Sequence, residues 1–149
     1  SSLADEYASA PRPSKALAEL LANGPNDPSQ GGALYLLLRA AQAFRLQRSC
    51  WPGEDKASLD ADQTQLKQCV AEVVKDLQLP PPANGSSHVS DELLAEFCRW
   101  GGGEMHAIAS VMGGIASQEA IKAATHQYQP LDNTFIFNGA NGTTAAAKL

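Results

Sequence analysis

The amino-acid sequence predicts a mainly α-helical protein with a small α/β part at its C-terminal end. Four stretches between residues 15 and 99 repeat apolar residues at the three- and four-residue spacing of amphipathic helices. Between Glu104 and Asn138, a helix rich in small residues is followed by a turn and by the apolar run Thr134-Phe135-Ile136-Phe137. Such a run is typical of a short buried strand. Helices that precede one helix–strand unit therefore define the expected fold class.

The first two helices are expected over residues 15–21 and 33–48. Ser14 can cap the first, and Gly24-Pro25 follows its end. The second ends before Trp51-Pro52-Gly53 and presents a wide apolar face, which predicts extensive burial. The residues of that face are Leu34, Leu37, Leu38, Ala41 and Phe44.

The third and fourth helices are expected over residues 57–78 and after Ser90. The third ends before three consecutive prolines, and residues 80–87 read as a flexible surface connection. Ser90 can cap the fourth helix, whose first turn carries Asp91 and Glu92 where a helix N-terminus favours negative charge. The apolar face of the third helix comprises Leu66, Cys69, Val70, Val73, Val74 and Leu77.

The helix that follows Glu104 has two apolar surfaces. One is a stripe of small residues, and the other is bulky. The small stripe would let another backbone approach closely, so this helix is expected to be buried between two layers. The small residues are Ala109, Gly113, Ala116 and Ala120, and the bulky ones are Ile108, Val111, Met112 and Ile115.

The length and the net charge of the chain argue against several classes of function. A chain of 149 residues can bury a core, and no apolar run approaches the length of a membrane span. The formal net charge of −5 argues against nucleic acid or an anionic membrane as the main partner. Arg39, Arg45 and Arg48 form a local basic group, which we interpret as a solvated helix face. Because the chain starts at Ser1 without a signal-peptide pattern, we expect it to be cut from a longer protein.

Three widely spaced cysteines suit a reducing compartment, cytoplasmic or nuclear, and argue against a disulfide scaffold or a zinc site. Cys69 lies on an apolar helix face and Cys98 follows Phe97, so both are expected to be packed. Cys50, at a helix end, is expected to be the most exposed. None has a cationic neighbour in sequence that would mark a reactive thiolate.

No catalytic, metal-binding or cofactor-binding residue can be nominated from the sequence. Gly101-Gly102-Gly103 precedes a helix, but no strand leads into it, as a phosphate-binding loop requires. We interpret Gly113 and Gly114 as a site of close helix packing. Gln118, Glu119 and Lys122 can contact a partner or satisfy buried polar groups, and Glu119 and Lys122 can also pair with each other. These five residues form the candidate partner or packing motif.

Four segments carry a resemblance to a known family. Residues 113–122 read Gly-Gly-Ile-Ala-Ser-Gln-Glu-Ala-Ile-Lys, and Pro130 to Phe137 follow. Together they resemble the C-terminal end of the adenylation (ThiF-like, Rossmann-type) domain in activating enzymes for ubiquitin-like modifiers. Two further segments are similar to the non-catalytic, regulatory subunit of the neddylation pathway's activating enzyme. They are Glu96-Phe97-Cys98-Arg99-Trp100-Gly101 and Tyr35-Leu36-Leu37-Leu38-Arg39-Ala40.

The resemblance implies a domain organisation and a role. Residues 1–99 would be a helical, insert-like subdomain, and residues 100–149 the C-terminal end of the adenylation-like domain. The expected partners are the catalytic subunit of the heterodimer, the ubiquitin-like modifier and the conjugating enzyme. ATP and Mg²⁺ would act in the complete heterodimer, with no cofactor in this chain, which would not be an enzyme alone. The alternatives are the corresponding subunit for a SUMO-type modifier and a stand-alone helical interaction module.

Overall fold

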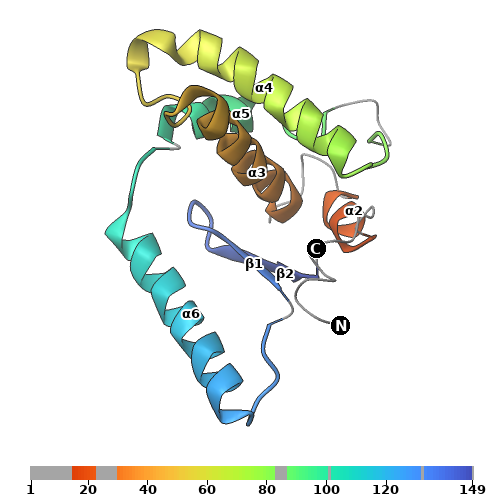
Figure 1. Ribbon diagram of the computed structural model, residues 1–149, viewed down its shortest axis with the longest axis vertical. Coiled ribbons are helices and arrows are strands. Elements are labelled where there is room, and N and C mark those ends of the chain that lie inside the picture. The colour runs from red at the N-terminus through yellow and green to blue at the C-terminus, as the bar shows by residue number, and fades with distance from the viewer. Residues whose placement is uncertain (1–14, 23–29, 83–86, 101, 132, 149) are drawn as a thin grey trace.

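The computed structural model describes residues 15–22, 30–82, 87–100, 102–131 and 133–148, and it is mainly helical with one small sheet. Figure 1 shows a group of helices, a hairpin and a separate long helix. The elements in chain order are α2 (Lys15–Leu21), α3 (Gly31–Arg48), the 3-10 turn η2 (Lys56–Ser58), α4 (Leu59–Asp76), α5 (Asp91–Trp100), α6 (His106–Thr125), β1 (Thr134–Asn138) and β2 (Thr143–Ala147). The predicted fold class is confirmed. Ser14, the expected cap of α2, lies outside the described residues.

Helix α3 is the centre of the helical part and contacts α2, α4 and the hairpin. Its buried side includes Leu36, Leu37 and Phe44, none of which is exposed to solvent. Leu66 and Cys69 of α4 complete this core from the opposite side. Removing apolar surface of this size from water is the main stabilising term of such a helical packing.

The loop between α3 and α4 is held by a buried carboxylate. Asp62 is 4% exposed, and its Oδ2 accepts hydrogen bonds from the Gly53 backbone N–H at 3.0 Å and from the Ser58 hydroxyl at 3.2 Å. Gly53 has a φ of 76°, and a Cβ there would overlap the Cys98 carbonyl. This close approach ties the loop to α5, and it explains why the glycine stands at this position.

The single helix expected over residues 57–78 is two elements. Asp55 Oδ1 accepts a hydrogen bond from the Ala57 N–H and so starts the 3-10 turn η2 before α4 begins at Leu59. The local hydrogen bond of an Asx side chain competes with a regular helix start, which accounts for the difference.

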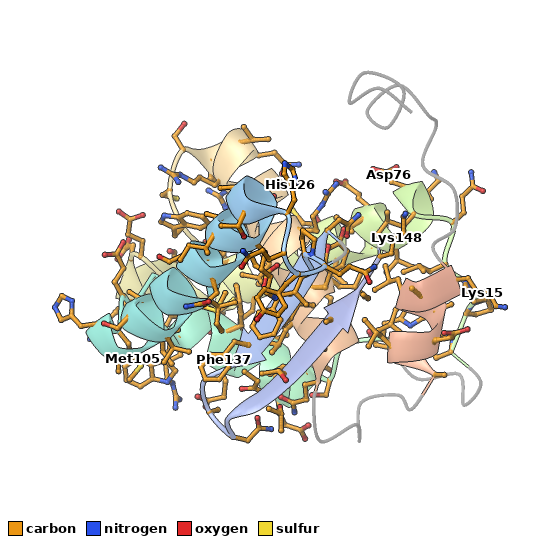
Figure 2. The ribbon with its side chains drawn as sticks, turned by 90° about the horizontal axis from the view of Figure 1, so that it is seen from below. Lys15, Asp76, Met105, His126, Phe137 and Lys148 are labelled. Carbon is orange, nitrogen blue, oxygen red and sulfur yellow. The ribbon has the colours of Figure 1, made fainter. Side chains whose placement is uncertain are left out.

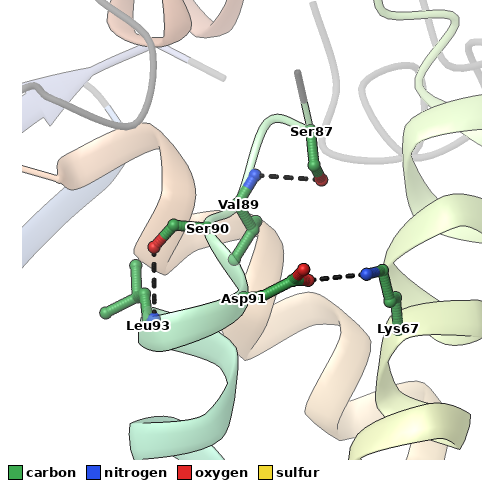
Figure 3. A network of polar contacts seen from close by, with 6 residues as sticks. All are labelled: Lys67, Ser87, Val89, Ser90, Asp91 and Leu93. Carbon is green, nitrogen blue, oxygen red and sulfur yellow. Dashed lines mark hydrogen bonds and ion pairs between the residues drawn. The ribbon is translucent and has the colours of Figure 1, made fainter.

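Helix α5 begins as the sequence predicts. Ser90 Oγ accepts a hydrogen bond from the Leu93 N–H at 3.1 Å, which confirms the predicted cap. Figure 3 shows this cap beside the ion pair that joins Asp91 to Lys67 of α4, whose atoms are 2.6 Å apart. The two side chains of the ion pair are largely exposed, so the pair adds little to stability.

Strands β1 and β2 form an antiparallel hairpin in which Thr134 faces Ala147 and Asn138 faces Thr143. The predicted strand is confirmed as β1. Ile136 and Asn138 are buried on the side that faces α3, and Asn138 Nδ2 donates to Gln30 Oε1 at the start of α3 over 3.4 Å. Side chains alternate along a strand, so Phe137 lies on the other side of the sheet.

Helix α6 covers that other side of the hairpin. Ile108 of α6 lies so close to Gly139 that a Cβ there would meet its side chain, and the Phe137 ring is also near. The sheet therefore lies between α3 and α6, as Figure 1 shows, and Figure 2 shows α6 running from Met105 to His126 beside the hairpin that carries Phe137. Within the described ranges, no helix is long and apolar enough to cross a membrane.

The expectation that α6 is buried between two layers does not hold within this chain. None of the described residues of α6 is buried, because the hairpin covers one side only. The two parts expected at residues 1–99 and 100–149 are in contact through α3 and β1.

Candidate functional site

The inner side of α6 is a half-buried stripe that faces the hairpin. Its residues follow one another at intervals of four and three, which places them on one side of the helix. They are Ile108, Met112, Ile115, Glu119 and Lys122. Of the predicted motif, Glu119 and Lys122 thus belong to this inner side.

Glu119 joins the end of α6 to the segment that leads into β1. Its Oε1 lies 2.7 Å from Lys122 Nζ, and its Oε2 accepts a hydrogen bond from the Leu131 N–H at 2.7 Å. The hydrogen bond from Lys122, followed by that from Leu131, lowers the pKa of the Glu119 carboxyl. Sequence spacing predicted the pair with Lys122, but the contact with Leu131 depends on the path of the loop.

The opposite side of α6, which we call the α6 outer face, is exposed and uncharged. Glu119 and Lys122 are the only Asp, Glu, Lys or Arg residues of α6, and both lie on its inner side. The outer face consists of Ala109, Ser110, Gly113, Gly114, Ala116, Ser117, Ala120 and Ile121. Surface helices of soluble proteins carry their charged residues outward, so this arrangement is the reverse of the usual one.

Gly113 and Gly114 are open in this structure. A Cβ added at either position meets nothing within 4 Å among the described residues. Gln118 is also exposed, and no described residue hydrogen-bonds to its side chain. The structure therefore brings Glu119 and Lys122 together and leaves the other three motif residues on the exposed surface. Close packing at Gly113 remains a prediction for a partner outside these residues.

The cysteines are poorly placed for covalent chemistry. Cys69 and Cys98 are buried as expected, and Cys50, half-buried against the helical core, is the most exposed of the three, as the sequence predicts. Burial, assisted by the charge of Asp62, raises the pKa of the Cys98 thiol to about 11. Burial, with a smaller contribution from Glu72, also raises the pKa of Cys69. Thiols with raised pKa values are weak nucleophiles at neutral pH.

The segment that precedes Gly102 and Gly103 is helical. Helix α5 extends to Trp100, so a helix and not a strand leads toward Gly102 and Gly103. Among the described residues, no group of three His, Cys, Asp or Glu side chains could hold a metal ion.

The lack of charge across the whole α6 outer face was not predicted from the sequence. The signal was present, because residues 106–118 contain no Asp, Glu, Lys or Arg. The sequence predicts two apolar surfaces on this helix. Which of the two is exposed to solvent depends on the position of the hairpin.

No protein-family model matches the chain. Curated proteins do match it. Over 83% of its length the chain is 37% identical to a NEDD8-activating enzyme E1 regulatory subunit of Danio rerio, and over 76% it is 41% identical to that of Caenorhabditis elegans. A SUMO-activating enzyme subunit 1 of Rattus norvegicus is 32% identical over 73% of the chain.

The chain spans about a fifth of the length of the NEDD8-activating relatives, namely 22% of the Danio rerio protein and 21% of the Caenorhabditis elegans protein. Several further regulatory subunits, including one of Arabidopsis thaliana at 38% identity, match over a similar span. Over most of its length, the chain is therefore similar to a stretch that makes up about a fifth of the NEDD8-activating enzyme E1 regulatory subunits.

Proposed function

We propose that this chain is the C-terminal part of the regulatory subunit of a heterodimeric activating enzyme for a NEDD8-like modifier. Its role in that enzyme is structural. It completes the adenylation-like domain of its own subunit and supports the catalytic partner subunit, which adenylates the modifier with ATP and Mg²⁺ and then carries it as a thioester. The modifier and the conjugating enzyme are partners of the assembled heterodimer.

The uncharged outer face of α6 is the observation that carries this proposal. Ile121 of this face is 54% exposed, and no charged side chain separates it from the small residues of that face. An apolar surface of this kind is usually an interaction surface. Because this chain spans only about a fifth of the relatives' length, the remaining part of the subunit is the proposed cover for α6.

The state of the cysteines supports a non-catalytic role. A thioester requires an accessible thiolate, whereas two of the three thiols here are buried and have raised pKa values. The ATP and Mg²⁺ sites are proposed to lie outside this chain. Purified alone, it should not catalyse exchange of pyrophosphate into ATP in the presence of a modifier.

Co-purification tests the proposed partner. The full-length subunit that contains this chain is co-expressed with tagged catalytic subunits of the NEDD8 type and of the SUMO type. Retention by the NEDD8-type subunit alone is the expected result. Retention by the SUMO-type subunit alone would favour the SUMO-activating role, and retention by neither would favour the stand-alone interaction module.

A further inference from the structure

A second exposed surface, on α3, combines basic and apolar side chains. The residues Leu38, Arg39, Gln42, Arg45 and Leu46 are all exposed. Successive residues of an α-helix are rotated by about 100°, which places these five within one third of the helix circumference. We call them the α3 outer face. The opposite side of α3, with Leu36, Leu37 and Phe44, forms the core.

The two leucines are unusually exposed for their size. Leu46 is 87% and Leu38 is 51% exposed, although both belong to a helix whose other large apolar residues are covered. A single exposed leucine needs no explanation, but two on one face beside arginines have the composition of a binding surface.

The arginines on this face have no acidic partner in the described part of the chain. Helix α3 contains no Asp or Glu, and the ion pairs among the described residues involve Lys67, Arg99 and Lys122. The Arg45 guanidinium instead lies 4.6 Å from the centroid of the Trp51 ring. This cation–π contact holds the guanidinium in place and leaves its hydrogen-bond donors for another group.

Position on the helix also separates this face from an ordinary C-terminal charge cluster. Arg45 and Arg48 lie in the last turn of α3, where cations complement the helix dipole. Arg48 is further accounted for by its hydrogen bond to Gln65 Oε1 at 2.6 Å. Arg39, two turns earlier, gains nothing from the dipole, so the helix terminus does not account for its charge.

We infer that the α3 outer face binds an acidic protein segment with apolar side chains. Leu38 and Leu46 would contact its apolar residues, while Arg39 and Arg45 would bind carboxylates, to which a guanidinium donates two parallel hydrogen bonds. Nucleic acid and anionic membranes present the same negative charge, but the net charge of −5 on the chain repels extended polyanions. A short acidic segment meets only the local basic surface.

A binding experiment with a synthetic probe tests this inference. The probe is a fluorescein-labelled peptide of glutamate with leucine at every third or fourth position, and its binding to the protein is followed by fluorescence anisotropy. Saturable binding that weakens as salt is raised is expected. A matched peptide with glutamine in place of glutamate should bind at least about tenfold more weakly, since charge-assisted hydrogen bonds are lost.

Two sets of variants locate the site. The pair Arg39→Gln and Arg45→Gln should weaken peptide binding by about tenfold or more. The pair Lys67→Gln and Lys75→Gln removes the same charge from α4 and should leave binding unchanged. Leu46→Gln, at a side chain that contributes nothing to the core, should also weaken binding while the circular dichroism spectrum stays the same.

Four binding results would overturn the inference. They are absence of saturable binding, equal loss in the two charge-removing pairs, equal affinity for the glutamine peptide, and preferential binding of phosphatidylserine vesicles or a single-stranded oligonucleotide. Self-association of the protein that Leu46→Gln abolishes would assign the face to a second copy instead, and it would likewise overturn the proposal.

Discussion

Gly53 and Gly142 both have positive φ angles, 76° and 72°, but their surroundings differ. A Cβ at Gly53 would overlap the Cys98 carbonyl, whereas a Cβ at Gly142 meets nothing within 4 Å in the described part of the chain. The two glycines therefore separate the cost of a left-handed backbone from the cost of a steric clash.

We predict that Gly142→Ala lowers the free energy of unfolding by about 1 kcal/mol, the usual cost of left-handed backbone for a residue with a Cβ. Gly53→Ala should cost at least about twice as much, because the α3–α4 loop must also move away from α5. Urea denaturation monitored by circular dichroism measures both values. Equal losses would show that the approach of Gly53 to Cys98 does not constrain the loop.

The pKa of Cys98 leads to a second prediction at the scale of single residues. The pKa is raised to about 11 from an ordinary value of 9.0, so folding favours the neutral thiol. The contribution of Cys98 to stability is present below pH 9 and is lost as the pH rises from about 9 toward 11, because only the unfolded chain then ionises.

Alkylation by iodoacetamide at pH 7.5, followed by mass spectrometry, measures the thiolates directly. Half-buried Cys50 should react first, and Cys98 and Cys69 should react slowly until urea unfolds the protein. Rapid labelling of native Cys98 would contradict the account, since a thiol with this pKa is almost entirely protonated at that pH.

At the scale of elements, α6 depends on Glu119 for its connection to β1. Glu119→Gln removes the charge that holds Lys122 and weakens the bond from the Leu131 N–H. We predict faster amide hydrogen exchange at Leu131 with unchanged exchange in α3. Gln118→Ala is the matched control, because Gln118 is exposed and should leave both regions unaffected.

The same bond should weaken in acid. The pKa of Glu119 is lowered in the folded protein, so its contribution is present above the ordinary carboxyl pKa of 4.5 and is lost as the pH falls through the lowered value. Exchange at Leu131 that is equally slow in wild type and Glu119→Gln would show that the carboxylate does not hold this segment.

Gly113 tests whether the α6 outer face is covered in the longer protein. In the 149-residue chain, Gly113→Leu has room and replaces a poor helix former, so the melting temperature should stay the same or rise. In the full-length subunit, a leucine would overfill the predicted contact at a cost of about 1–3 kcal/mol. Gly113→Ala is the smaller control. A leucine variant that is equally stable in both forms would show that nothing approaches Gly113.

The sequence predicted those elements whose formation depends on local pattern. Helices α2, α3 and α5 and strand β1 follow from apolar spacing and from the Ser90 cap. Strand β2, by contrast, reads Thr-Thr-Ala-Ala-Ala and shows no apolar alternation, so its extended form depends on pairing with β1. The exposure of α6 could not be predicted from the sequence either. A helix with two apolar surfaces has the same residue pattern whether the element that covers its second surface belongs to the same chain or to another.

At the scale of the whole molecule, the chain combines a self-contained helical core with a hairpin and a helix that is covered on one side only. The core around α3 buries large apolar side chains, whereas the described residues of α6 include no buried side chain. Such a contrast is expected where the residues that contact the exposed side of α6 lie outside this chain. It agrees with the finding that the chain spans only about a fifth of the length of its relatives.

The location of the thioester tests the central claim most directly. The full-length subunit that contains this chain and a NEDD8-type catalytic subunit, each with a different tag, are incubated with ATP, Mg²⁺ and labelled modifier and then separated on a non-reducing gel. We predict a reducible adduct on the catalytic subunit alone, which forms only when the present subunit is added and persists with Cys50→Ala, Cys69→Ala or Cys98→Ala. An adduct on the present subunit, or equal adduct formation without it, would contradict the proposed non-catalytic role.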